Sequence, residues 1–245
     1  MSHAQLQPIA PELWGAEHDL YLPGGVHFRG RMTVLRLASG GLLLHSPIPL
    51  VPALSDELRA LGPVEAVVAP SLLHHLFAGP ALAAHPAARS YAPAALRQKR
   101  PDLRIDAALQ VGAGAPPWAG ELRPIFIAGV PAMDEWVFWH PATRTLLLTD
   151  LVFHILEASN WQSRLLFRAL GYYGRFAQSR VLGWLTRDRA ALQRSIGEVL
   201  ALPVERVVPA HGPVLAEGAH AALAGALGHL RPPAALSGGA PSAGR

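Results

Sequence analysis

Short apolar runs separated by turn-forming residues recur along the chain. Two pairs of such runs predict β-hairpins: residues 32–37 with 42–44, and residues 136–139 with 145–149. Gly40 and Gly41 join the first pair, and the turn-forming segment 140–144 joins the second. Four single runs predict further strands, at 64–69, 90–92, 122–128 and 206–209.

Between these strands, apolar residues recur at the spacing of a helix. Leu54, Leu58 and Leu61 share one helical face, and Ser55 is a suitable N-cap, so a helix is predicted over 55–61. More helical segments are predicted at 80–88, 93–99, 157–201 and 216–230. Strands and helices are therefore mixed, with a hairpin opening each half. This order predicts an α+β fold, either as two packed sheets with outer helices or as a simpler layout.

Size and composition suit one large domain, which we expect over residues 1–230, or two small domains with no obvious seam. The chain has 245 residues, of which 51% are hydrophobic and 16% charged, so it can bury a sizeable core. No apolar run is long enough for a transmembrane helix, and the first residues lack the pattern of a secretory signal. A cytoplasmic location is expected. The tail 231–245 is rich in Pro, Gly, Ser and Ala, which predicts disorder.

Cysteine is absent, which excludes disulfides, thiolate metal sites and cysteine nucleophiles. Any metal must therefore be held by His, Asp or Glu. The net charge of +4 is carried almost entirely by arginine, with Lys99 as the only lysine. This mild excess lacks the clustered basic stripe of a nucleic-acid-binding protein, so nucleic acid is not an expected partner.

Five candidate residues follow predicted strands: His45, His74, His75, Asp150 and His211. Ligand and catalytic residues collect where strands run into loops, because the sheet fixes their position while the loop leaves a cavity. Imidazole and carboxylate groups are suitable ligands for zinc, iron or manganese. Each residue alone has a simpler interpretation, as a turn residue, a helix cap or a partner of a backbone carbonyl. Placed after successive strands, they could converge at one rim of the fold.

The order of these motifs resembles the metallo-β-lactamase superfamily. The matching stretches are HSP at 45–47, APSLLHHLF at 69–77, LLLTD at 146–150 and PAHG at 209–212. The resemblance covers roughly residues 30–230. It is greatest to a divergent subgroup known mainly as a domain of unknown function. It implies an αββα four-layer sandwich, metallo-β-lactamase-like, with two mixed sheets and outer helices.

The chain departs from the His-x-His-x-Asp-His motif of that superfamily. Laid over the motif, Pro70 and Leu72 replace the first two histidines, His74 replaces the aspartate, and His75 keeps the last histidine. A further family histidine would fall near 129–130, where none stands. The resemblance therefore implies one metal ion at most. The expected ligands are His75, Asp150 and His211, with His74 as a fourth ligand or a base.

Three functions remain open. The first is a mononuclear metal-dependent hydrolase of ester, lactone, thioester or phosphoester bonds, with one zinc (iron or manganese as alternatives) and with His74 or His45 as general base or orienting residue. The second is a degenerate, metal-free protein that binds a ligand or partner. The third is an iron-dependent oxidoreductase. Asp134 and Glu135 add two carboxylates near the expected rim, but a solvated turn is the favoured interpretation for them.

The segment 157–201 is predicted to be a helical insertion in the domain, between two of the expected ligands. Arginines alternate there with Trp, Tyr and Phe. Such a segment can cover the pocket as a lid, receive an anionic small molecule, or lie on a membrane surface. The favoured interpretation is an ordinary amphipathic helix pair whose arginines face water.

Overall fold

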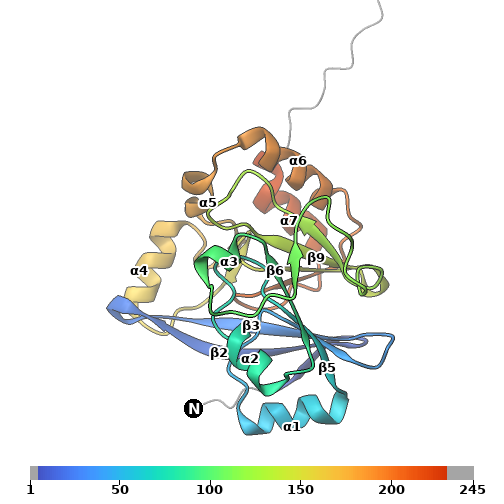
Figure 1. Ribbon diagram of the computed structural model, residues 1–245. Helices are drawn as coiled ribbons and strands as arrows, with labels where there is room; N and C mark the ends of the chain where they lie inside the picture. Colours follow the sequence, from blue (N-terminus) through green and yellow to red (C-terminus); the bar gives the residue numbers. More distant parts are fainter. Residues whose placement is uncertain (1–4, 231–245) are drawn as a thin grey trace, which may run out of the picture.

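A seven-stranded sheet forms the first half of the molecule. The computed structural model describes residues 5–230, and Figure 1 shows its elements. The strands lie in sequence order: β1 (Gln7–Ala10), β2 (Leu13–Leu22), β3 (Val26–Arg36), β4 (Leu42–His45), β5 (Val64–Val68), β6 (Arg89–Pro93) and β7 (Ala107–Leu109). Neighbouring strands from β1 to β4 pair antiparallel, and those from β4 to β7 pair parallel. A short 3-10 turn, η1 (Pro23–Gly25), joins the long strands β2 and β3.

The second half contains a four-stranded sheet in the order β13-β10-β9-β8. Its strands are β8 (Arg123–Phe126), β9 (Trp136–His140), β10 (Thr145–Leu148) and β13 (Arg206–Pro209). The first three pair antiparallel, whereas β13 pairs parallel to β10. A small two-stranded sheet joins β11 (Phe153–Ile155) to β12 (Arg175–Ala177).

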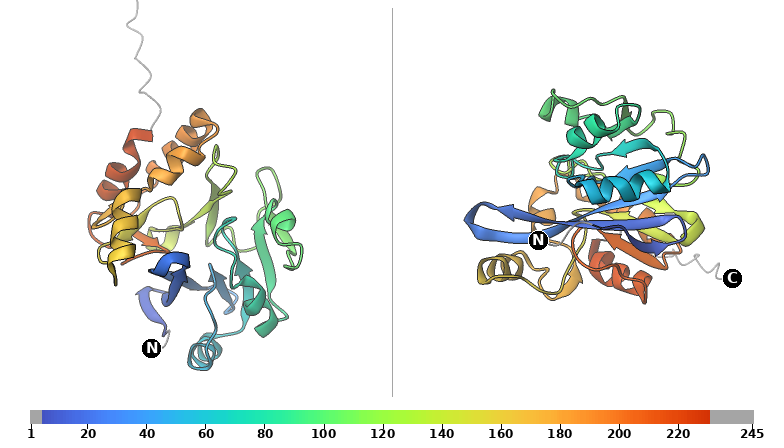
Figure 2. Two further views of the ribbon diagram at one scale, coloured as in Figure 1. Left: turned by 90° about the vertical axis from the view of Figure 1, so that its left-hand side faces the viewer. Right: turned by 90° about the horizontal axis from the view of Figure 1, so that it is seen from below.

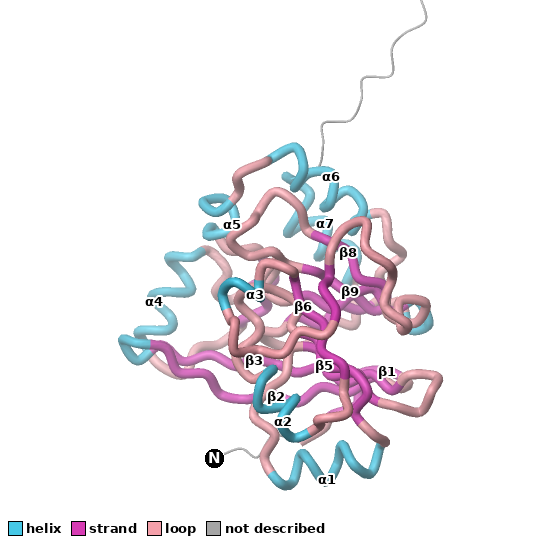
Figure 3. The backbone as a smooth tube through the Cα atoms, in the orientation of Figure 1, coloured by secondary structure: helices cyan, strands magenta, loops and turns pink. Residues whose placement is uncertain are grey.

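Helices cover the outer faces of both large sheets (Figures 2 and 3). The first sheet carries α1 (Pro52–Leu61), α2 (Ala78–Ala84) and the short α3 (Leu96–Lys99). The second carries α6 (Arg189–Leu200) and α7 (Ala219–Leu227), which ends in the 3-10 turn η3 (Gly228–Leu230). Two further helices, α4 (Trp161–Leu170) and α5 (Arg180–Leu185), lie between β11 and α6 in the chain. The result is the expected αββα sandwich.

Three apolar layers account for this arrangement. Leu54 and Leu58 of α1 pack on one face of the first sheet. The other faces of the two sheets meet in a middle layer that includes Phe138. Buried residues of α6 and α7 cover the far face of the second sheet. Because strand side chains alternate between faces, each sheet contributes to two layers. Within residues 5–230, each helix is too short or too polar to traverse a bilayer.

Both predicted hairpins are confirmed, as β3–β4 and β9–β10, joined at the second turn by η2 (Pro141–Thr143). The predicted helix at 55–61 begins earlier, because Pro52 stands at its first turn and Val51 is its N-cap. The predicted helical segment 157–201 also contains the strand β12. One domain with an insertion at 157–201 stays a prediction, as does the cytoplasmic location, and the tail 231–245 lies outside the described residues.

Candidate metal centre

Strand pairing brings Asp150 and His211 together. β10 and β13 run parallel, with Leu148 opposite Pro209. Asp150 and His211 each stand two residues beyond this pair, so they leave the sheet at the same edge. His74 comes from the loop after β5 in the other sheet. This loop is held by hydrogen bonds from Leu72 N to Met133 O (2.8 Å) and from Trp136 N to Pro70 O (2.9 Å).

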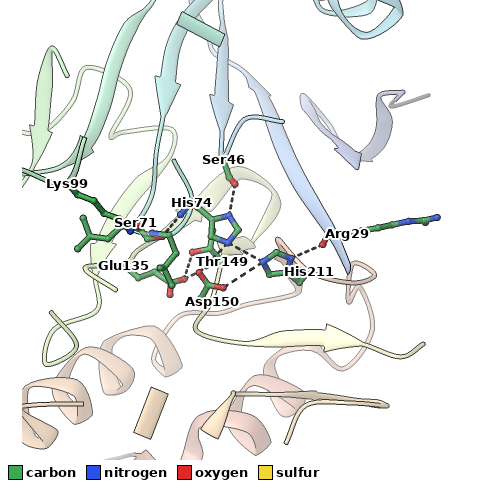
Figure 4. Close-up of polar contacts among 11 residues, drawn as sticks. Arg29, Ser46, Ser71, His74, Lys99, Glu135, Thr149, Asp150 and His211 are labelled. Carbon is green, nitrogen blue, oxygen red and sulfur yellow. Dashed lines mark hydrogen bonds and ion pairs between the residues drawn. The ribbon is translucent and has the colours of Figure 1, made fainter. Parts of the chain in front are cut away.

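The three side chains point at one another (Figure 4). One ligand atom from each of His74, Asp150 and His211 lies within 4.8 Å of the other two. The Nε2 atoms of His74 and His211 are 3.2 Å apart. Asp150 Oδ2 is 3.3 Å from Nε2 of His74, and Asp150 Oδ1 is 3.7 Å from Nε2 of His211. Asp150 Oδ2 accepts no well-aligned hydrogen bond from the described residues.

The orientation of His211 is fixed on its far side. Its Nδ1 donates a hydrogen bond to the carbonyl oxygen of Arg29 at 2.7 Å. A carbonyl only accepts, so in the neutral ring Nδ1 carries the hydrogen and Nε2 presents a lone pair to the centre. Phe153 stacks on the ring at 5.4 Å between centroids, and Phe28 meets its edge at 4.8 Å. His211 is therefore held as a preformed ligand.

Gly212 allows the backbone to follow the path that places His211 at the centre. Its φ is +100°, and an added Cβ would lie 1.8 Å from the carbonyl oxygen of His154. The chain is tied down at the same place, because His154 N donates to the His211 carbonyl oxygen at 2.9 Å. Only glycine can combine this backbone conformation with so close an approach.

His74 is held by two serines. Its Nδ1 lies 2.8 Å from Oγ of Ser46, and its backbone N–H donates to Oγ of Ser71 at 3.0 Å. Ser46 has a φ of +53°, a left-handed conformation that is uncommon outside glycine. This conformation places the Ser46 hydroxyl against the histidine. The second nitrogen, Nε2, is thereby directed to Asp150 and His211.

The charges of the centre separate the pKa values of its two histidines. Burial lowers the pKa of His74, but the Asp150 carboxylate, with Glu135 beyond it, outweighs burial and raises it above the ordinary value. At His211, burial and the positive charge of His74 lower the pKa to about 4. Burial raises the pKa of Asp150, yet the charges of His74 and His211 bring it below its usual range. Without a metal ion, His74 thus binds a proton more readily than His211 does, and it faces two acceptors.

Glu135 is a fourth buried group at the centre. It is 1% exposed, and its Oε1 accepts hydrogen bonds from Thr149 N (2.9 Å) and Thr149 Oγ1 (2.7 Å). Its Oε2 has no hydrogen-bond partner among residues 5–230. Burial and the adjacent charge of Asp150 raise the pKa of Glu135 to about 7. Its proton is therefore exchanged near neutral pH.

The donor set fits a divalent metal ion. Two ligand atoms at about 2.0–2.2 Å from one tetrahedral ion lie about 3.3 Å from each other. The pairs His74–His211 and His74–Asp150, at 3.2 and 3.3 Å, match this spacing. Two imidazoles and a carboxylate are ligands that zinc and iron accept. Asp150 Oδ2, which accepts no well-aligned hydrogen bond from the described residues, supplies the carboxylate oxygen that such an ion needs.

His75 lies outside the group of His74, Asp150 and His211, so the structure does not bring it together with the other expected ligands, and its role as a ligand stays a prediction. Its Nδ1 is 3.1 Å from Nη1 of Arg100, next to α3. Successive side chains of the loop point in different directions, because the turn at Ser71 directs only His74 inward. Burial and the charges of Lys99 and Arg100 lower the pKa of His75.

His45, Asp134 and Glu135 also lie outside the group of three ligands. His45, at the end of β4, is 2% exposed, and its ring meets Phe138 at 4.9 Å. Its Nε2 has no partner in the described part of the chain, and burial followed by the charge of His74 lowers its pKa to about 3. A catalytic role for His45 stays a prediction. Asp134 is half-buried, whereas the favoured interpretation of Glu135 as a solvated residue is wrong.

A family model described as "Domain of unknown function (DUF4336)" matches residues 12–165. The chain belongs to this family. The matched segment contains His74, Asp150 and the Asp134–Glu135 pair, but ends before His211. The expected subgroup, known mainly as a domain of unknown function, is thereby confirmed. No curated protein matches the sequence significantly.

Solved structures show that this DUF4336 protein has a divergent metallo-β-lactamase fold. A metallo-β-lactamase from Pontibacter korlensis matches at 16% identity and a TM-score of 0.62, covering 93% of this chain and 99% of that one. The metallo-β-lactamase FIM-1 from Pseudomonas aeruginosa in its mono-zinc form matches at 13% identity and 0.64, covering 94% and 97%. A metal-soaked flavodiiron core from Synechocystis sp. matches at 13% and 0.63, covering 93% of this chain and 60% of that one.

Several residues that build the centre carry no sequence signal of their own. Ser46 could have been noticed in the HSP stretch, but its contact with His74 depends on a left-handed backbone. Arg29 contributes only a carbonyl oxygen, from 182 residues away. Thr149 precedes Asp150, and this position next to a candidate ligand was the one signal that pointed to it.

Proposed function

We propose that this protein is a mononuclear metal-dependent hydrolase of ester, lactone, thioester or phosphoester bonds. The observation that carries the proposal is the convergence of His74, Asp150 and His211, with one ligand atom from each within 4.8 Å of the others. Three protein ligands leave one position open in a tetrahedral site, which is typical of catalytic rather than structural zinc. We further propose that the substrate is a small molecule and that it carries an anionic group.

Each residue has a distinct task in this proposal. His74, Asp150 and His211 would hold the ion, which when bound lowers the pKa of its water toward about 7. Ser46 and the Arg29 carbonyl hold the two imidazoles with their Nε2 atoms inward. Glu135 is the nearest group whose pKa, about 7, suits a proton acceptor at neutral pH. Burial lowers the pKa of His45 to about 3, so its ring stays neutral at neutral pH, and its role as general base or orienting residue stays part of the proposal.

Iron is the metal of a second candidate function. Two histidines and one carboxylate are also the ligand types of non-haem iron sites. The similarity in fold to a flavodiiron core supports an iron-dependent oxidoreductase as this alternative. The degenerate, metal-free interpretation rests on Pro70 and Leu72, which stand where the superfamily has two metal-binding histidines.

A metal-reconstitution assay tests the hydrolase. The protein is stripped with a chelator, reloaded separately with zinc, iron and manganese, and assayed against a panel of esters, lactones, thioesters and phosphoesters. We expect one class to be hydrolysed only after reloading, and Asp150→Asn to abolish the gain. Redox activity with iron in place of hydrolysis would favour the second candidate. Absence of any gain, with no metal bound, would favour the ligand-binding protein.

A further inference from the structure

Asp19, His27 and Ser159 form a hydrogen-bonded chain that includes none of the metal ligands. Ser159 Oγ lies 2.6 Å from Nδ1 of His27, and Nε2 of His27 lies 2.9 Å from Oδ1 of Asp19. Ser159 stands 132 residues from His27 in the sequence. A hydroxyl, an imidazole and a carboxylate in this order are the components of a serine nucleophile with its base and orienting acid.

The β2–β3 hairpin builds two parts of this chain. In its register Asp19 pairs with Arg29, and Tyr21 pairs with His27. Because strand side chains alternate, Asp19 and His27 lie on the same face as diagonal neighbours. Helix α4 lies beside the outer end of this hairpin (Figures 1 and 2). Ser159 immediately precedes α4 and completes the chain.

The protonation pattern suits a base at His27. The hydrogen bond from His27 lowers the pKa of Asp19, and Arg29, 3.2 Å from Asp19 Oδ1, lowers it further against the effect of burial. An ionised carboxylate only accepts, so Nε2 of His27 carries the hydrogen and Nδ1 accepts from the Ser159 hydroxyl. The two ring nitrogens are exchanged relative to the usual triad, but the proton path is equivalent.

The nucleophile opens on a cavity. Ser159 is exposed, and it lines a cavity of about 500 Å³ together with His27. Phe28, Ile155 and Phe167 give this cavity an apolar wall. The charges of Glu17 and Arg29, which also line it, are paired at 3.6 Å. Glu157 adds a further carboxylate to the lining, so the cavity disfavours an anionic substrate and favours one with an uncharged apolar group.

Two backbone N–H groups of the first turn of α4 follow Ser159 in the sequence. Asn160 is the N-cap of the ten-residue helix α4, and its side chain accepts from Ser163 N at 2.8 Å. The N–H groups of Trp161 and Gln162, in the first turn, have no intrahelical acceptor. They follow the Ser159 hydroxyl by two and three residues. Such donors stabilise the negative oxygen that forms when a serine attacks a carbonyl.

The Ser159 hydroxyl is not needed to attach α4 to the hairpin. His27 N donates to Ser163 Oγ at 2.8 Å, and Asn160 Nδ2 donates to Gly25 O at 2.9 Å. Phe167 of α4 also packs against Phe28 at 6.3 Å between ring centroids. These contacts already fix the helix. The contact between Ser159 and His27 is thus available for chemistry.

We propose that Ser159, His27 and Asp19 form a second, metal-independent hydrolytic site for carboxylic esters with an apolar acyl or alcohol group. Oγ of Ser159 bonds to the ester carbonyl carbon while its proton passes to His27. The bond to the alcohol oxygen then breaks, and the alcohol leaves with that proton. Water attacks the acyl-serine, gives a proton to His27, and releases the acid as Ser159 takes the proton back.

Labelling and kinetics on the chelator-treated full chain test the proposal. The probes are a fluorophosphonate, read by peptide mass spectrometry, and 4-nitrophenyl butyrate. We expect the label on Ser159 and ester hydrolysis that persists without metal. Ser159→Ala and His27→Gln should each lower the rate by about 100-fold or more. Asp19→Asn should lower the rate and change its pH profile, which a merely structural carboxylate would not do.

Two control variants make the outcome decisive. Ser39→Ala removes another exposed serine, whose hydroxyl bonds to Glu65 and not to the triad, and should leave labelling and rate unchanged. His220→Gln replaces a histidine of α7 that lies outside the triad and does not line the cavity, and it should leave this ester activity intact. An unlabelled Ser159, or a Ser159→Ala protein that hydrolyses at the wild-type rate, would overturn the proposal. Ester hydrolysis lost on chelation and in His211→Ala, but kept in Ser159→Ala, would overturn it while supporting the metal-dependent hydrolase.

Discussion

At the scale of single residues, the proton on His74 and a metal ion compete for the same atom. Nε2 of His74 faces Nε2 of His211 at 3.2 Å and Asp150 Oδ2 at 3.3 Å. Asp150 raises the pKa of His74 in spite of burial, so this nitrogen is more readily protonated than that of an ordinary histidine. Metal binding therefore has to release that proton.

We expect zinc affinity to fall by about tenfold per pH unit below the pKa of His74. The measurement is a competition titration with a chromophoric chelator at pH 6, 7 and 8. Calorimetry in buffers of different ionisation enthalpy counts the protons released. Asp150→Asn removes the cause of the raised pKa and serves as the comparison. An affinity that is constant over this range would contradict a protonated His74 in the metal-free centre.

The pKa of His45 shifts in the opposite direction to that of His74, which makes the stability of the fold depend on pH. Its folded-state pKa of about 3 is below the ordinary 6.5, so the unfolded chain binds the proton more tightly. Its contribution to stability is present above pH 6.5 and is lost as the pH falls toward 3. Between pH 7 and pH 5 this amounts to about 2 kcal/mol. His45→Leu should remove that loss, and also the buried Nε2 without a partner.

Urea unfolding of the metal-free wild type and His45→Leu at pH 7 and pH 5 measures this difference. The other buried groups are common to both proteins, so the difference in their acid loss reports on His45. Equal losses in the two proteins would show that His45 does not stay neutral in the folded state.

At the scale of elements, glycine backbones decide where side chains reach. Gly212→Ala would place a Cβ against the His154 carbonyl, at 1.8 Å before relaxation. We expect a loss of about 1–3 kcal/mol in the free energy of unfolding, together with weaker metal binding because His211 moves. Gly174→Ala is the matched control, since it has a φ of +73° but no atom within 4 Å of the added Cβ. Gly174→Ala should lower the free energy of unfolding through backbone strain alone, without weakening metal binding.

Chemical denaturation and a zinc titration of both alanine variants give the two readouts. Metal binding as tight in Gly212→Ala as in Gly174→Ala would contradict the role of Gly212 in placing His211.

The elements also show how far the sequence could be interpreted. Strands with continuous apolar runs, such as β4 and β10, were predictable because both of their faces are buried. β2 was not, because Glu17, His18 and Asp19 interrupt its pattern where the hairpin extends beyond the core. Asp150 and His211 could be expected to meet, since both follow parallel neighbours.

The directions of individual side chains could not be predicted from the sequence in the way that the strands could. Nothing in the pair His74–His75 shows that only the first points inward, because this depends on the turn at Ser71 and on contacts with Met133. Glu135 resembled a surface residue until its bonds to Thr149 were known. The Asp19–His27–Ser159 chain joins segments too far apart for a sequence motif.

At the scale of the whole molecule, the fold gives two separate places for chemistry. The metal ligands lie where the two large sheets meet, and the serine chain lies where α4 joins the β2–β3 hairpin. The cavity at the hairpin reaches Gly212, the residue after His211. The segment 157–201 supplies Ser159, and a role for it as a lid stays one of the alternatives that the sequence leaves open.

The central claim is that His74, Asp150 and His211 hold one metal ion and that His75 does not. Elemental analysis of untagged protein, purified without chelator and reloaded with zinc, tests it most directly. The account predicts about one metal ion per chain in the wild type and in His75→Ala, and almost none in His211→Ala. Metal loss in His75→Ala equal to that in His211→Ala, or no metal in the reloaded wild type, would contradict it.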